Sequence, residues 1–139
     1  MLLLVGLVNK RRIPEFKRTQ NFTIADFDTL STLIGWFGKL VTTPHVLSQV
    51  SDLTDLSGKE LTIVRRHFVL LVQKVEEYYD TGTALVTDPL FVRLGLTDAA
   101  IAKVSSRGIL VLTSDLALHL ALQHRGFDAL NFNHLRAMG

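Results

Sequence analysis

In the C-terminal third of the chain, the pattern of apolar and polar positions predicts a helix, a strand and a second helix. The first helix is expected to begin at an N-cap on Thr97 and to end at Gly108, since glycine is favoured just after a helix. The continuous apolar run 109–112 is typical of a parallel strand buried on both faces. Apolar positions at helical spacing then continue through 116–125. This succession indicates an α/β fold.

Two aspartates stand at the starts of these helices. Asp98 falls in the first turn of the first helix, and Asp115 follows the strand directly. Ligands of open α/β sheets bind at the carboxyl ends of the strands, so Asp115 is expected at that edge, within reach of Asp98. Each aspartate can simply cap its helix. Alternatively, the pair can bind a hard cation, since Mg²⁺ and Mn²⁺ prefer carboxylate and water ligands.

Two further helices are expected in the first part of the chain. Their starts at Thr23 and Ser57 read Thr-x-x-Asp and Ser-x-x-Glu, which are capping-box patterns. The first helix is expected to run to Gly38 with Trp36–Phe37 in the core, and the second to end before Gly82.

Short elements are expected between these helices. The run Leu40–Thr43 reads as a strand, and Pro44 suits the first position of the next helix. The pair Asp88–Pro89 starts a helical turn, and 127–132 reads as the last strand. The apolar start 2–5 fits either a buried strand or a buried helix, because so short a run shows no period.

The sequences GLTDAAI, LVLTSD and HRGFDALNF resemble the C-terminal half of PIN-domain nucleases. These are metal-dependent ribonucleases, many of them the toxins of bacterial toxin–antitoxin pairs. The length of the chain indicates a single domain, residues 1–139. The resemblance implies that this domain is a three-layer α/β/α sandwich with a short, mainly parallel sheet. It also implies that Asp98 and Asp115 are catalytic acids that bind Mg²⁺ or Mn²⁺, and that Thr113 or Ser114 orients the site.

The chain departs from the family pattern in two places. The run TTPHVLSQVSDL resembles the family's strand-to-helix passage, but Gln49 stands where the family has a glutamate. Glutamine keeps a carbonyl oxygen and lacks the negative charge, so Gln49 is expected to be a weak ligand or to position a water. The family's first strand, with its aspartate, has no counterpart in this sequence, because MLLLVGLVNK resembles the helix that follows that strand. We therefore expect a chain shortened at its start, a member without that strand, or one in which residues 1–5 replace it.

Composition and charge limit the classes of protein. Of 139 residues, 47% are hydrophobic and 20% charged, as in a globular domain. The chain has no cysteine, which excludes disulfides, thiolate chemistry and zinc–cysteine sites. The net charge of +2 is compatible with a phosphate-bearing partner and does not indicate one. The apolar segment 1–8 is too short to span a bilayer and lacks the charge order of a signal peptide. We expect a cytoplasmic protein with no membrane partner.

These observations predict a PIN-type, Mg²⁺- or Mn²⁺-dependent endoribonuclease that acts on single-stranded RNA. Its activity is expected to be weakened or absent, since two of the family's usual acids are missing. The alternative is a non-catalytic PIN-like module that binds RNA or a protein partner. The basic segment 10–20 and the pair Arg65–Arg66 are either solvated or in contact with RNA. A cognate antitoxin and a homodimer are further partners that the sequence leaves open.

Overall fold

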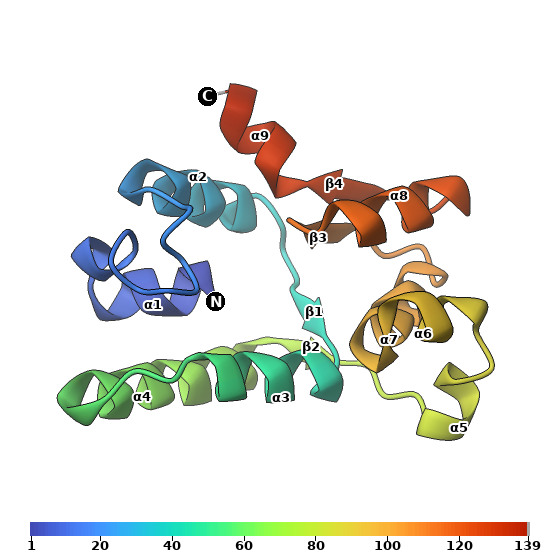
Figure 1. Ribbon diagram of the computed structural model, residues 1–139, viewed down its shortest axis with the longest axis horizontal. Coiled ribbons are helices and arrows are strands. Elements are labelled where there is room, and N and C mark those ends of the chain that lie inside the picture. The colour runs from blue at the N-terminus through green and yellow to red at the C-terminus, as the bar shows by residue number, and fades with distance from the viewer. Residues whose placement is uncertain (139) are drawn as a thin grey trace. The chain divides into compact units, whose positions relative to one another are not determined.

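The computed structural model describes residues 1–138, and the chain divides into two compact units, Met1–Glu77 and Tyr78–Gly139. The predicted α/β class is confirmed, because helices alternate with strands that pair into two parallel two-stranded sheets (Figure 1). Within the described residues, no helix combines the length and the apolar character needed to cross a membrane. The single-domain organisation stays a prediction.

The first unit is mainly helical and contains one of the two sheets. Strands β1 (Val41–Thr42) and β2 (Glu76–Glu77) pair in parallel, with Val41 opposite Glu76 and Thr42 opposite Glu77. The elements are α1 (Leu2–Val8), a 3₁₀ turn (Lys10–Arg12), α2 (Ile24–Gly35), β1 (Val41–Thr42), α3 (Pro44–Leu53), α4 (Gly58–Lys74) and β2 (Glu76–Glu77).

The apolar start of the chain is a helix, one of the two structures that its sequence allowed. Leu4 and Val5 are fully buried, and α1 packs against α2 and α4. The contact with α2 is close at Gly6, where an added Cβ would overlap the Phe27 ring. Only a residue without a side chain permits this approach of the two helices.

Helix α2 begins as predicted and ends earlier. Thr23 and Asp26 form the capping box: the Asp26 N–H donates to Thr23 Oγ1 (3.1 Å), and the Thr23 N–H donates to Asp26 Oδ2 (2.8 Å). The helix ends at Gly35, so the next two residues leave its apolar face. Trp36 is 76% exposed and Phe37 46% exposed, and their prediction as core residues was wrong.

Helix α4 departs from its prediction at both ends. Ser57 is its N-cap residue but makes no side-chain capping bond, and the Glu60 side chain pairs with Arg12 (Oε2–Nε 2.9 Å). The helix ends at Lys74, and Glu76–Glu77 is a strand, so the prediction of a longer helix was wrong. Parallel pairing with β1 outweighs the helical pattern here, as tertiary contacts often do.

The basic segment 10–20 is a loop of turns held by ion pairs. Lys10 bonds Asp28 (2.8 Å), and Lys17 bonds Asp55 (3.0 Å). The Asp55 carboxylate also lies 3.6 Å from Arg18. These cations therefore have protein partners, and contact of the segment with RNA stays a prediction.

The second unit carries the predicted helix–strand–helix succession. Strands β3 (Val111–Thr113) and β4 (Ala129–Asn131) pair in parallel beside α8 (Leu116–His124; Figure 1), with Thr113 opposite Asn131 at their carboxyl ends. The elements are α5 (Gly82–Leu85), α6 (Pro89–Leu94), α7 (Leu96–Ser105), β3 (Val111–Thr113), α8 (Leu116–His124), β4 (Ala129–Asn131) and α9 (Phe132–Met138).

The core of the second unit lies between the helices and one face of the sheet. Its members are the buried residues Leu90, Ala102, Val111, Leu118, Ala121 and Leu122. Burying a leucine side chain completely contributes about 1.5–3 kcal/mol, so Leu122 and Leu118 are major contributors. Val111 points into this core, whereas Leu112 is 37% exposed. The prediction of a strand buried on both faces was wrong, because this sheet is covered on one face only.

Candidate functional site

The carboxyl ends of β3 and β4 form one polar edge, because parallel strands end on the same side of a sheet. Thr113 and Asn131 are the last residues of the two strands and lie opposite each other. Asp115 begins α8 after β3, and Asn133 lies in the first turn of α9 after β4. We call these four residues, with Ser114, the carboxyl edge.

Hydrogen bonds fix the first half of the carboxyl edge. The Asp115 N–H donates to Thr113 Oγ1 (3.1 Å), so the threonine hydroxyl positions the aspartate backbone. Asp115 Oδ1 accepts from the Leu118 N–H (3.0 Å) and caps α8. The cap uses one carboxylate oxygen, and Oδ2 is the oxygen left for a ligand. Asp115 is exposed to solvent.

The second half of the edge is tied to the first through asparagines. The Asn133 N–H donates to Oδ1 of the buried Asn131 (2.9 Å). The Asn133 side chain donates from Nδ2 to the Ser114 carbonyl oxygen (3.2 Å). The start of α9 is thereby held against the loop after β3.

Asp98 lies in the first turn of α7, as predicted, although the helix starts one residue before the predicted cap. Gly95 has φ 94° and is at once the end of α6 and the N-cap of α7, so the prediction of Thr97 as cap was wrong. A positive φ suits glycine, and this conformation lets one residue separate two helices.

The Asp98 carboxyl group is half-buried, and its charge has no compensating partner. Burial raises its pKa, and the negative charge of Asp115 raises it further. Within residues 1–138 its side chain makes no hydrogen bond or ion pair. Asp98 and Asp115 are therefore close enough to repel each other, and an added cation would relieve that repulsion.

The donor set of this pair suits a hard divalent cation. Carboxylate, hydroxyl and amide oxygens are the ligands that Mg²⁺ and Mn²⁺ prefer. Within residues 1–138, no group of three or more His, Cys, Asp or Glu side chains could hold a metal together. Asp98 and Asp115 are the two carboxylates here that could serve as ligands of such an ion.

Gln49 lies exposed on α3 in the first unit. Its expected role as a weak ligand or water-positioning residue stays a prediction that rests on the resemblance. Thr113 acts on Asp115 through the backbone bond already described, which is a positioning contact.

Sequence reasoning missed His119 and the two asparagines of the carboxyl edge. His119 comes one helical turn after Asp115, a spacing that places two side chains on the same face of a helix. That spacing could have identified it. Asn131 could have been found as the strand-end counterpart of Thr113.

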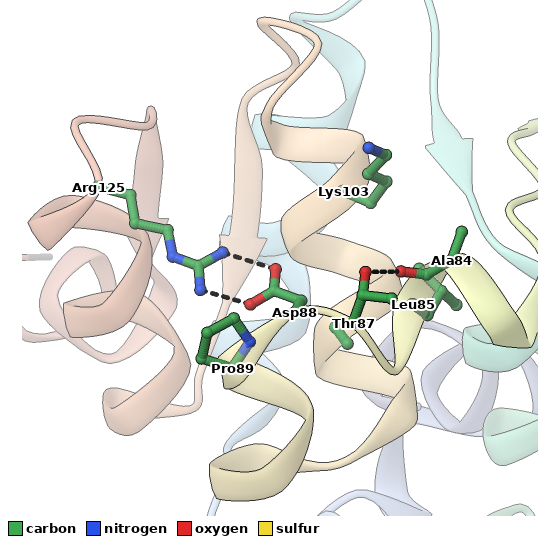
Figure 2. A pocket seen from close by; sticks show the side chains of 8 residues that line it. Ala84, Leu85, Thr87, Asp88, Pro89, Lys103 and Arg125 are labelled. Carbon is green, nitrogen blue, oxygen red and sulfur yellow. Dashed lines mark hydrogen bonds and ion pairs between the residues drawn. The ribbon is translucent and has the colours of Figure 1, made fainter.

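A second polar site in this unit is a pocket of about 330 Å³ (Figure 2). It is lined by Ala84, Leu85, Thr87, Asp88, Pro89, Ala99, Lys103 and Arg125. The Arg125 guanidinium donates two parallel hydrogen bonds to Asp88, from Nη1 to Oδ2 (2.8 Å) and from Nη2 to Oδ1 (2.6 Å). These bonds are the main reason that the pKa of Asp88 is lowered to about 2. The pocket's acid is therefore already neutralised by a protein cation.

Comparison of the chain with protein-family models, with curated proteins and with solved structures gives no match.

Proposed function

We propose that this chain is a PIN-like, metal-dependent ribonuclease domain whose activity is weakened or lost. The fold that accompanies this proposal is a three-layer α/β/α sandwich. The proposal rests on the placement of Asp115 at the carboxyl edge and of Asp98 in the first turn of α7, and it is supported by the raised pKa of Asp98, which burial and then the Asp115 charge cause. Ligands of parallel sheets bind at such an edge, and two repelling carboxylates there favour a bound cation.

In this proposal Asp98 and Asp115 hold one Mg²⁺ or Mn²⁺ ion, and the substrate is single-stranded RNA. Such an ion, when bound, stabilises charge on a phosphodiester and lowers the pKa of a water ligand. Thr113 keeps Asp115 in place through its bond to the Asp115 N–H. The raised pKa of Asp98 makes protons compete with the ion, so metal binding is expected to strengthen as the pH rises.

The activity is expected to be low because the negative charge of the site is small. Two carboxylates neutralise a single divalent ion, and Gln49 supplies no charge where the resembling family has a glutamate. Loss of one carboxylate near a divalent ion is worth on the order of several kcal/mol at a surface-like dielectric. Weak metal binding and slow or absent cleavage follow.

Calorimetric titration with Mn²⁺ tests the site. We expect weak binding by the wild-type chain, and binding at least about 10-fold weaker in Asp98→Asn and in Asp115→Asn. The matched control is Asp128→Asn, which removes the same charge from an exposed residue just before β4, at the other end of the sheet. Equal Mn²⁺ binding by the wild type and both site variants would make these aspartates structural residues only.

Incubation with single-stranded RNA and Mn²⁺ tests the activity. We expect little or no cleavage by residues 1–139. Robust cleavage that Asp98→Asn abolishes would show a competent nuclease and contradict the expected weakness. Robust cleavage that neither aspartate variant alters would instead show that the activity lies elsewhere.

The second candidate is a non-catalytic PIN-like module that binds RNA or a protein partner such as an antitoxin. The observation that favours it is the hydrogen bond from the Leu118 N–H to Asp115 Oδ1, since that bond already gives the aspartate a structural role as a helix cap. Gln49 favours it as well. RNA binding in a gel-shift assay, without cleavage and independent of Mn²⁺, would support this candidate over the first.

A further inference from the structure

A pair of histidines lies beside the carboxyl edge and takes no part in the site proposed above. His119 on α8 and His134 on α9 face each other with ring centroids 5.6 Å apart and ring planes at 89°. The two residues are 15 positions apart in the chain, so tertiary packing and not local sequence brings them together.

His119 is the buried member of the pair. Its exposed fraction is 4%, and its Nδ1 atom has no hydrogen-bond partner within the described residues. A buried polar atom usually has a partner, and one without requires an explanation such as a functional role or a bound ion. A nitrogen lone pair in a neutral imidazole can bind a proton or a metal.

His134 is the exposed member, and its backbone is held in place. Asn133, the residue before it, donates from its N–H to Asn131 and from its side chain to the Ser114 carbonyl oxygen. His119 is equally fixed, because Asp115 caps the helix that carries it. Both imidazoles therefore extend from anchored helix starts, which lowers the entropy cost of binding an ion between them.

The separation of the rings suits a shared metal ion. With nitrogen–zinc bonds of about 2.0–2.1 Å and tetrahedral angles, two imidazoles on one ion have centroids about 5 Å apart. The observed 5.6 Å is close to that value. The edge-to-face orientation requires a turn of one ring, and His134 can turn about χ2 because its side chain is exposed.

We propose that His119 and His134 form a two-imidazole site for a borderline divalent metal, for which Zn²⁺ is the probe. Imidazole favours Zn²⁺ and its neighbours Co²⁺, Ni²⁺ and Cu²⁺ over Mg²⁺, so this site differs in chemistry from the carboxylate pair. Within residues 1–138 no third His, Cys, Asp or Glu joins the pair, and water fills the other positions. This proposal does not depend on ribonuclease function.

Calorimetric titration with Zn²⁺ at pH 7.5, where imidazole is mainly neutral, tests the proposal. The informative variant is His134→Ala, because an exposed side chain can be removed without opening the core. The matched control is His124→Ala, which removes an exposed histidine at the end of α8. We expect Zn²⁺ binding at least about 10-fold weaker in His134→Ala and unchanged in His124→Ala.

A second measurement follows the imidazole ¹⁵N resonances of the wild-type chain during the titration. We expect the signals of His119 and His134 to shift together and the His124 signal to stay in place. No Zn²⁺ binding by the wild type would overturn the proposal. So would binding that His134→Ala leaves unchanged, or that Asp98→Asn and Asp115→Asn remove while His134→Ala does not, because the ion would then be at the carboxylates.

Discussion

Two aspartates of the second unit, each at the start of a helix, are treated by the fold in opposite ways. Asp88 caps α6 through Oδ1, which accepts a hydrogen bond from the Leu90 N–H (2.8 Å). Its carboxylate also accepts hydrogen bonds from both terminal nitrogens of Arg125. Its pKa falls to about 2. Asp98 faces the charge of Asp115 instead, is half-buried, and has a raised pKa.

The difference separates a structural carboxylate from a candidate functional one. At Asp88 the ionised form is stabilised, so the charge contributes to folding. At Asp98 the ionised form lowers the free energy of unfolding, and carboxylates with such raised pKa values cluster at functional sites. Asp88 is the N-cap residue of α6, whereas Asp98 lies in the first turn of α7. The Arg125 guanidinium lowers the pKa of Asp88, whereas burial, followed by the charge of Asp115, raises the pKa of Asp98.

Substitution of Asp88 should have the largest effect on the free energy of unfolding. Asp88→Ala removes a helix cap and a bidentate ion pair, each worth about 1 kcal/mol, so we expect a loss of about 2 kcal/mol in the free energy of unfolding. Asp88→Asn keeps an oxygen for the cap and is expected to lose about half as much. Chemical denaturation at pH 7 measures both. Wild-type stability in Asp88→Ala would contradict the structural role.

The pH dependence of the Asp88 contribution has a definite sign. Because its pKa is lowered from 3.8 to about 2, the contribution is complete above pH 3.8 and is lost as the pH falls towards 2. The stability difference between the wild type and Asp88→Asn should therefore narrow over that interval. A difference that stays constant down to pH 2 would mean that the charge of Asp88 contributes nothing.

The contribution of Asp98 to the free energy of unfolding should depend on pH in the opposite direction, and the change should be smaller. Because its pKa is raised, its ionisation costs stability as the pH rises from the ordinary value through the folded-state value. We expect Asp98→Asn to be more stable than the wild type at pH 7, by less than about 1 kcal/mol, because it removes a charge that burial and the neighbouring Asp115 both disfavour. The two proteins should converge below the ordinary pKa of aspartate. A destabilised Asp98→Asn at pH 7 would remove the contrast with Asp88.

The smallest expected effect is on the pKa of Asp98, which burial and the charge of Asp115 both raise. Asp115→Asn removes the second cause, the like charge, and leaves the first, burial. We expect the Asp98 pKa to move down and to stay above its ordinary value, as measured by ¹³C NMR titration of the carboxyl groups. An unchanged Asp98 pKa in this variant would show that the two carboxylates do not interact.

The sequence predicted local elements well where one local signal was decisive. The capping box at Thr23, the Pro44 start of α3 and the Asp88–Pro89 start of α6 all occur in the structure. The three predicted strands are present in shorter form. Each of these signals acts within a few residues, so no knowledge of distant contacts was needed.

Two of the errors arise where a distant partner changes the local outcome. The Glu60 side chain, predicted to take part in a capping box, forms an ion pair with Arg12, 48 residues away. The segment Glu76–Glu77, predicted to be helical, pairs with β1 as a strand. The same limit applies to the candidate site. The positions of Asp98 and Asp115 at helix starts follow from local pattern, whereas the His119–His134 contact depends on how α9 is docked.

The close approach of Gly6 to the Phe27 ring has a consequence for the evolution of the first unit. A side chain at position 6 would collide with an aromatic ring that is itself buried in the core. A larger residue at position 6 alone overpacks the contact, and a smaller residue at position 27 alone leaves a void in the core, so each substitution by itself is destabilising. Positions 6 and 27 should therefore vary together among descendants of this sequence, with a residue larger than glycine at 6 accepted only after a smaller one at 27.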